Sequence, residues 1–231
     1  MEQYLKAEPY PFPYNGNLTP ENTALIIIDM QYDFCKPGGW CEYRGEDVSR
    51  NASIIPALQN LLEAARKVEG FTIIHTREGH RADLSDLPDN KRFRSALWGG
   101  EIGSEGPLGR FLTRGSKSWD IVEELYPLPG EPIIDKCGKG SFVATDLEQI
   151  LRLKGIQNII LTGVTTECCV HTTMRHANDL GFECVMLEDC TESCNADNYE
   201  YIVRHTRNTG LFGVLSNSGE IIKWLESCKQ K

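Results

Sequence analysis

Short, unbroken apolar runs recur along this chain, separated by polar segments. In the clearest run, residues 24–28 are all apolar and the carboxylate of Asp29 follows. Runs of this kind are typical of parallel strands that are buried on both faces. We predict such strands at 23–29, 71–75, 132–136, 158–162, 183–188 and 211–215.

Helical spacing occupies several of the intervals between these strands. From Ile54 onward, apolar residues recur three or four positions apart, which predicts a helix. Two capping boxes, 145–148 and 197–200, predict helices that run to Lys154 and to about Asn208. Further helices are expected at 118–126, from the cysteine pair at 168–169 toward 180, and at 219–228.

Strands that alternate with helices pair in parallel through right-handed crossovers. The pattern therefore predicts one α/β domain over residues 1–231, with three α/β/α layers and a six-stranded, mostly parallel, Rossmann-like sheet. Residues 30–52 are rich in glycine and polar groups and predict a loop, while 77–118 predict a long lid or binding loop. Residues 1–20 interleave prolines with aromatics, which indicates an extended arm that packs on its own domain or on a neighbouring subunit.

The composition narrows the possible functions. The net charge of −9 offers no basic face for nucleic acid. No apolar run reaches membrane-spanning length, so no membrane partner is expected. The nine cysteines are odd in number, follow no secretory signal and include no CxxC pair. We therefore expect reduced thiols in a cytoplasmic protein, in place of a disulfide framework, a zinc ribbon or a thioredoxin-like site.

Reactive side chains fall at the ends of three predicted strands. Asp29 ends the first, Lys136 ends the third, and the pair Cys168 and Cys169 follows the fourth. Because ligands of parallel sheets bind beyond the carboxyl ends of the strands, one edge would gather all of these groups. A thiol at a helix start is also expected to ionise more readily, since the helix dipole favours negative charge there. Each residue alone fits a structural role, but together they indicate covalent catalysis by a thiol.

Three blocks of the sequence resemble the isochorismatase-like cysteine hydrolases. They are 24–31 (ALIIIDMQ), 135–136 (DK) with 140–142 (GSF), and 163–170 (GVTTECCV). The blocks occur in the order that the family has them, and the resemblance covers nearly the whole chain. It implies a hydrolase of small amides in a family that includes nicotinamidases, ureidoacrylate amidohydrolases and biuret hydrolases.

The resemblance also implies roles for individual residues. The nucleophile of the family directly precedes a valine, so Cys169 would be the nucleophile and Cys168 its neighbour. Asp29 would be the general base and Lys136 the third member of a catalytic triad. A cis peptide before Thr165 would turn the backbone amides of Thr165 and Cys169 toward one point, forming an oxyanion hole.

Within the family, four segments most resemble biuret hydrolases: 10–16, 75–81, 112–115 and 135–142. We therefore predict hydrolysis of biuret to allophanate and ammonia, or hydrolysis of triuret, through a thioester. In that subgroup a glutamine reads the substrate amide, and Asn208 takes its place here on a shorter arm. Phe34 and Lys139 are also expected to bind the substrate, with Trp40 a further candidate for the pocket wall.

Nicotinamidases of this family bind a divalent metal through an aspartate and several histidines after the second strand. The corresponding region here offers Glu78 and His80, with Asp83 and Asp86 downstream, and lacks the full histidine set. We therefore predict that the protein uses no metal and no cofactor, and that nicotinamide is not its substrate. The resemblance further implies a homotetramer or dimer, with the aromatic arm at the interface.

Two alternatives stay open. One is hydrolysis of ureidoacrylate or another linear amide by the same residues. The other is a noncatalytic thiol-rich scaffold or redox sensor on the same fold, which the cysteine count alone would allow. Loss of Asp29 or Lys136 would favour the scaffold, and both residues are present. Isochorismate is not an expected substrate, because that chemistry in the family proceeds without the cysteine.

Overall fold

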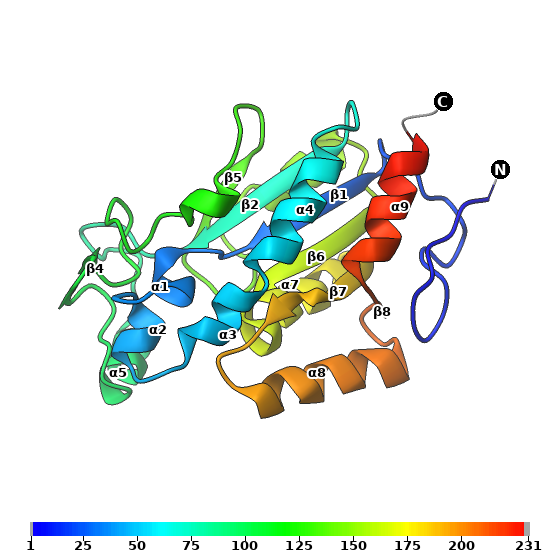
Figure 1. Cartoon of the computed structure of the whole chain (residues 1–231). Helices are drawn as coiled ribbons and strands as arrows, with labels where there is room; N and C mark the ends of the chain where they lie inside the picture. The colour runs from blue at the N-terminus through cyan, green and yellow to red at the C-terminus, as the bar shows by residue number, and fades with distance from the viewer. Residues whose placement is uncertain (1, 229–231) are drawn as a thin grey trace.

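All six predicted strands form in the computed structural model, which describes residues 2–228. They are β1 (Thr23–Ile28), β2 (Thr72–Glu78), β5 (Ile133–Lys136), β6 (Asn158–Val164), β7 (Glu183–Glu192) and β8 (Val214–Ser216). Their order across the sheet is β5-β2-β1-β6-β7-β8, and every neighbouring pair is parallel (Figure 1). The chain builds outward from β1 on one side and then on the other. Ligands of α/β proteins bind where the strand order reverses in this way.

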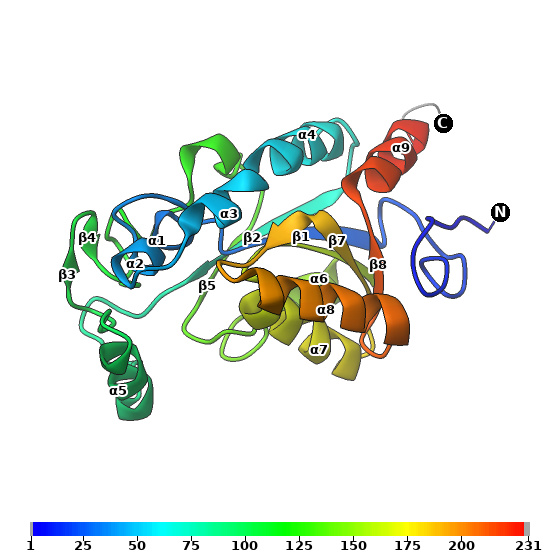
Figure 2. The ribbon, with the colours of Figure 1, turned by 60° about the horizontal axis from the view of Figure 1, so that its bottom comes forward.

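Alternate residues of each central strand enter two separate hydrophobic layers. Leu25 and Ile27 pack in one layer, whereas Ala24, Ile26 and Ile28 pack in the other. The first layer contains α4 (Ile55–Ala65) and α9 (Ser218–Cys228), and the second contains α6 (Leu147–Leu153), α7 (His171–Asp179) and α8 (Ala196–Thr209). Figure 2 shows the two sets of helices on opposite faces of the sheet. The predicted three-layer α/β/α arrangement is confirmed, and burial on both faces explains the continuous apolar run of β1.

The N-terminal arm packs on its own chain. The backbone of Glu8 exchanges two hydrogen bonds with Leu215 of β8, at 2.9 and 2.8 Å. The Ser216 hydroxyl donates to the carbonyl of Lys6, and Phe12 is fully buried. The arm thus covers the outer edge of β8, whose backbone groups would otherwise lack partners. Of the two placements predicted for the arm, the structure has the one within the chain.

The segment 30–52, which we predicted as a loop, contains three short helices. They are α1 (Tyr32–Cys35), α2 (Trp40–Tyr43) and α3 (Val48–Ser53). The prediction was wrong because helices of one or two turns are too short to show an apolar period. Their arrangement depends on buried Asp33, whose carboxylate accepts the backbone N–H groups of Trp40 and Leu112 at 3.0 and 2.9 Å.

The segment 77–118 is also more ordered than predicted. β2 continues to Glu78, α5 (Asp89–Leu97) follows, and β3 (Glu105–Gly106) pairs with β4 (Gly109–Arg110) in an antiparallel hairpin. α5 projects from the body of the molecule (Figure 2), and Ser95 is its one buried residue. The apolar residues Phe93 and Leu97 stand four positions apart but are each 67% exposed, and one such pair in a short, charged helix was too weak a pattern to predict it.

The capping box predicted at 197–200 is wrong, and the one at 145–148 forms only in part, since the Thr145 hydroxyl accepts the Leu147 N–H at 3.4 Å; both predicted helices form. The cap of α8 is Asn195, whose Oδ1 accepts the backbone N–H groups of Asp197 and Asn198 at 2.9 and 3.3 Å. α6 begins after Asp146, which makes no side-chain capping bond. Asparagine is as good a cap as the residues of the predicted boxes, so local sequence left more than one start possible.

Two further elements are shorter than predicted. The helix expected at 118–126 is reduced to the 3₁₀ turn η1 (Glu123–Leu125). The last strand begins at 214 in place of 211, because Leu211 is 62% exposed and Gly213 adopts a φ of 135° that breaks the strand.

None of the nine cysteines, all of which lie within residues 2–228, forms a disulfide. This agrees with the expectation of reduced thiols. No helix in the same part of the chain has the length and apolar character needed to cross a bilayer.

Candidate active site

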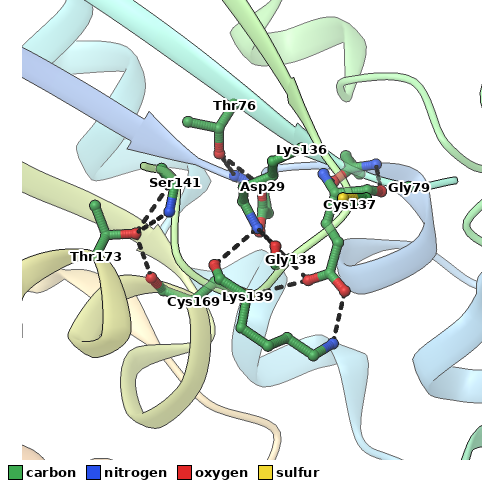
Figure 3. Close-up of polar contacts among 12 residues, drawn as sticks. Asp29, Thr76, Gly79, Lys136, Cys137, Gly138, Lys139, Ser141, Cys169 and Thr173 are labelled. Carbon is green, nitrogen blue, oxygen red and sulfur yellow. Dashed lines mark hydrogen bonds and ion pairs between the residues drawn. The ribbon is translucent and has the colours of Figure 1, made fainter. Parts of the chain in front are cut away.

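Four strands each deliver one charged or reactive side chain to a single region beyond the sheet (Figure 3). Asp29 directly follows β1, Glu78 is the last residue of β2, and Lys136 is the last residue of β5. Cys169 lies in the π-helical turn η2 (Thr166–Val170) that follows β6. The pairing of β2 with β5 sets Glu78 directly opposite Lys136. The structure therefore brings together the three residues that we predicted as a triad, together with a fourth.

Asp29 and Lys136 form a fully buried ion pair. The Lys136 Nζ lies 2.7 Å from the Asp29 Oδ2, and the Thr76 hydroxyl donates to the Asp29 Oδ1 at 2.6 Å. The same ammonium donates to the carbonyls of Gly138 and Lys139, at 3.0 Å each. A buried ion pair is stable only when such additional hydrogen bonds offset the loss of hydration. The two charges are thus held in one geometry.

Glu78 links this ion pair to the cysteine, and we did not predict this role. The Cys169 thiol donates to the Glu78 Oε2 at 3.2 Å. The Lys136 Nζ lies 3.5 Å from the same oxygen, and the Lys139 Nζ lies 2.7 Å from Oε1. We refer to Asp29, Glu78, Lys136, Lys139 and Cys169 as the lysine-paired cluster.

Glu78 escaped prediction because we ended the second strand at 75 and considered Glu78 only with the possible metal ligands. In the structure β2 continues to Glu78, which stands level with Lys136 at the end of β5. If the second predicted strand had been extended to the edge of the sheet where Lys136 lies, the Glu78 carboxylate would have been placed beside that lysine.

Burial and the nearby ammonium groups shift the pKa values of the two carboxyl groups of the cluster in opposite directions. Burial raises the pKa of Asp29, and the attraction of Lys136 opposes that rise only in part. Burial also acts to raise the pKa of Glu78, but the ammonium groups of Lys139 and Lys136 outweigh it and hold this pKa at about 2. Burial likewise acts to lower the pKa of Lys136, but the neighbouring anions raise it. Glu78 is therefore ionised, and Asp29 is the better proton acceptor of the two.

The resting thiol of Cys169 is protonated, contrary to our expectation for a helix start. Its hydrogen bond with Cys168 and its burial raise its pKa well above the ordinary value. The carboxylates of Glu78 and Asp29 add to this rise, and Lys136 opposes it. Both carboxylates have an oxygen within 4.8 Å of the sulfur, so local charge outweighs the helix dipole. Chemistry at this sulfur therefore needs a proton acceptor.

Close backbone packing fixes the turn that carries Cys169. Gly163 of β6 lies opposite Ile28 of β1 with a φ of 99°, and a Cβ there would lie 2.0 Å from the Ile28 carbonyl oxygen. Only glycine fits this position. The peptide between Val164 and Thr165 is cis, as we predicted from the resemblance.

A cavity of about 700 Å³ opens beside Cys169. Its wall includes Phe34, Trp40, Cys41, Arg44, Glu46, Trp98, Lys139, Thr165, Glu167, Cys168, Cys194, Asn195 and Asn198. Two of the three residues predicted to bind substrate, Phe34 and Lys139, thus lie at the cavity, as does Trp40.

Asn208 does not lie at this cavity, so the prediction for it was wrong. It is exposed near the C-terminal end of α8, whereas Asn195 and Asn198 at the N-terminal end contribute to the cavity wall. An α-helix rises about 1.5 Å per residue, so the two ends of this helix are roughly 20 Å apart. Matching the family position by its place before the last strand selected the wrong end of the helix.

Within residues 2–228, two groups of side chains have the spacing to hold a metal ion. One is Asp29, Glu78 and Cys169, and the other is Cys41, Glu46 and Cys194. In the first group, the Lys136 ammonium already lies against both carboxylates and compensates their charge.

The residues weighed from sequence as nicotinamidase-type ligands do not gather with Glu78 in that part of the chain. The His80 Nδ1 instead faces the Asp86 carboxylate at 3.2 Å. Asp83 accepts the N–H and hydroxyl of Ser85 in a local turn.

Comparison with known proteins agrees with this geometry. Residues 23–218 match the isochorismatase domain. The chain belongs to the isochorismatase family. The ureidoacrylate amidohydrolase RutB of Cronobacter turicensis is 33% identical over 175 residues, which cover 74% of this chain and 75% of that protein. RutB of Caulobacter vibrioides is 30% identical over 196 residues, which cover 84% and 85% of the two chains.

A solved structure supports the fold of this isochorismatase-family chain. The crystal structure of a cysteine hydrolase from Pseudomonas syringae pv. phaseolicola 1448A has a TM-score of 0.78 at 24% identity and covers 96% of this chain and 98% of that one. The family match extends from the first residue of β1 to the first residue of α9, so it includes all the strands that carry the lysine-paired cluster.

Proposed function

We propose that this chain is a cysteine-dependent amidohydrolase that cleaves a C–N bond of a small linear ureido compound. The observation that carries the proposal is a thiol at a cavity wall, 3.2 Å from one buried carboxylate and beside the Asp29–Lys136 ion pair. Membership of the isochorismatase family and the similarity to two amidohydrolases support the same reaction class.

In the proposed mechanism, Cys169 is the nucleophile and Asp29 the base. Asp29 takes the thiol proton because its raised pKa makes it the stronger acceptor, while Glu78 orients the S–H bond. The thiolate attacks the ureido carbonyl carbon, and the amides of Thr165 and Cys169 stabilise the oxyanion. The C–N bond then breaks, and the departing nitrogen takes the proton from Asp29.

This first half leaves a carbamoyl thioester on Cys169. Asp29, again unprotonated, removes a proton from water, which attacks the thioester carbonyl. The C–S bond breaks, the sulfur recovers the proton from Asp29, and the carbamate product leaves. Lys136 holds Asp29 in place throughout and keeps the buried charge compensated.

A ureido acid such as ureidoacrylate now suits the protein better than biuret, which we first preferred. Both curated relatives act, by name, on ureidoacrylate. Arg44 and Lys139 on the cavity wall are the cations that a substrate carboxylate would meet, each now paired with a carboxylate of the protein, Glu46 and Glu78. Asp47 and Glu167 line the same wall, so the preference for a ureido acid rests mainly on the two relatives. The match of Asn208 to the amide-reading glutamine of biuret hydrolases also fails, because Asn208 lies outside the cavity.

The test is ammonia release from a panel of ureidoacrylate, biuret, triuret, nicotinamide and malonamide. We expect the kcat/KM for ureidoacrylate to exceed that for biuret by at least about tenfold, the effect of one well-placed charge contact. Arg44→Gln should reduce the ureidoacrylate value and leave the biuret value unchanged. A higher kcat/KM for biuret would restore the first preference, and no release from any compound would favour the noncatalytic scaffold.

A further inference from the structure

We propose that Cys41, Glu46 and Cys194 bind a thiophilic divalent cation, of which Zn²⁺ is the expected example. We refer to these three residues as the second thiol cluster. Their ligand atoms all lie within 4.8 Å of one another. Zinc bonds of about 2.3 Å to sulfur and 2.0–2.2 Å to oxygen place tetrahedral ligand atoms roughly 3.5–3.8 Å apart. Small side-chain movements would therefore close the three donors around an ion.

The donors come from two parts of the chain that the fold brings together. Cys41 lies on α2, Glu46 follows that helix, and Cys194 immediately precedes the cap of α8. Neither half of the site forms a recognisable sequence motif, since the cysteines are separated by more than half of the chain. For this reason we did not predict a metal site at these residues.

Within residues 2–228, the ion pair made by the second thiol cluster is on its carboxylate. The only ion pair of Glu46 within residues 2–228 joins it to Arg44 at 3.0 Å, whose guanidinium also stacks on Trp40. A divalent cation would compensate two thiolates and the carboxylate together.

The cavity gives an ion access to the three donors, and a neighbouring side chain holds one of the two sulfurs in place. All three donors line the 700 Å³ cavity, so an ion can reach them and a water molecule can complete the coordination. Fully buried Asn51 donates an amide N–H to the Cys194 sulfur at 3.2 Å and a second N–H to the Phe34 carbonyl at 2.9 Å. A donor of this kind holds a ligand sulfur in its binding orientation.

Binding exchanges two S–H bonds for two sulfur–metal bonds, so two thiol protons pass to the solvent. The affinity must therefore rise with pH. The bound ion would sit on the wall of the cavity that Cys169 also lines, but its binding does not depend on the proposed hydrolase activity.

The experiment is a titration of the reduced full-length protein with Zn²⁺ against a chromophoric chelator, repeated with Cd²⁺ to observe the thiolate absorption band. A phosphine reductant keeps the thiols reduced without competing as a thiol. We expect one equivalent of tightly bound ion. Cys194→Ser and Cys41→Ser should each weaken binding at least about 100-fold, since even the loss of an outer-shell partner costs 10–100-fold.

Glu46→Gln is a milder variant in a partly exposed side chain and should weaken binding about tenfold without affecting folding. Cys228→Ser, at the end of α9 and outside the cavity, and Cys169→Ser are the controls that should retain binding. The proposal is overturned if the wild type binds no ion, or if binding survives Cys194→Ser and is lost in Cys169→Ser. The second result would assign the ion to the lysine-paired cluster.

Discussion

Two groups of thiols and carboxylates border the same cavity, and they differ mainly in their counter-charge. The lysine-paired cluster contains two carboxylates and Cys169, with two ammonium groups within 3.5 Å of Glu78. The second thiol cluster has a similar donor set, but in the described part of the chain the cation paired with it, Arg44, contacts the Glu46 carboxylate and the Trp40 ring.

The difference shows how one set of ligand types can serve two purposes. Where lysines supply the positive charge, the sulfur stays available as a nucleophile and the carboxylates can move protons. Where no cation faces the thiols, the same atoms have the composition of a zinc site. The counter-charge, more than the donor atoms, separates the two proposals, and the following predictions test that separation.

The largest effect is expected from Cys169→Ser. Replacing the nucleophile should reduce kcat by about 10⁴-fold or more, because covalent catalysis is lost while the fold stays intact. Ammonia release measures the loss, and circular dichroism checks the fold. Cys168→Ser is the matched control at the adjacent position and should retain most of the activity. Comparable losses in both variants would show that Cys169 has no special role.

Lys136→Met should cost the most stability. It leaves the Asp29 carboxylate buried without its cation, so the free energy of unfolding should fall by about 3–5 kcal/mol. Denaturant titration at neutral pH measures this change. Lys139→Met is the matched control: its side chain is 40% exposed, and water can partly replace it. If the free energy of unfolding fell equally in the two variants, the buried Asp29–Lys136 pair would contribute no more to stability than the partly exposed Lys139.

The pH dependence of stability should depend on Glu78. Its pKa of about 2 in the folded state lies below the ordinary 4.5, so its contribution is present above about pH 5 and disappears as the pH falls toward 2. The difference in unfolding free energy between wild type and Glu78→Gln should therefore shrink by up to about 3 kcal/mol over that range.

Glu131 also has a pKa of about 2, but it titrates in both proteins and cancels in the comparison. The raised pKa of Asp29 changes stability in the opposite direction, because the stabilisation that comes from protonated Asp29 is lost as the pH rises. A difference that stays constant between pH 5 and 2 would mean that Glu78 is not held ionised by the lysines.

The smallest effect concerns the cavity wall. Asn198→Ala should raise KM about tenfold if its amide contacts the substrate, a loss of roughly 1.4 kcal/mol. Asn208→Ala, on the same helix but outside the cavity, should change kcat/KM less than about twofold. Steady-state kinetics with the best substrate of the panel decide the comparison. A larger kinetic effect of Asn208→Ala than of Asn198→Ala would indicate that Asn208 contacts the substrate after all.

The predictions from sequence succeeded where one strong local pattern sufficed. The apolar run of β1 marks a strand buried on both faces, and its end placed Asp29 at the ligand-binding edge. Lys136 and the cysteine pair 168–169 followed from the same reasoning about strand ends, and the resemblance to the family selected Cys169 from the pair. By contrast, Glu78 required the register between β2 and β5, which no single segment contains.

Other features depend on contacts between distant parts of the chain. α5 is short and charged and buries only a serine, so packing against the core leaves little trace in its sequence. Which end of α8 faces the cavity depends on how the helix lies across the sheet, and the local sequence does not show this. We therefore chose Asn208, although Asn198 at the other end lines the cavity. The raised pKa of Cys169 depends on its hydrogen bond with Cys168 and on burial by the surrounding fold, to which the carboxylates of Glu78 and Asp29 add.

The pairing of the arm with β8 has a consequence for the order of events during synthesis. Glu8 emerges from the ribosome long before its partner Leu215, and every other strand of the sheet is made between them. The arm must therefore wait, unpaired, until nearly all of the sheet has been made. Since contacts of such sequence separation also form slowly, closure of this edge should be a late step in folding.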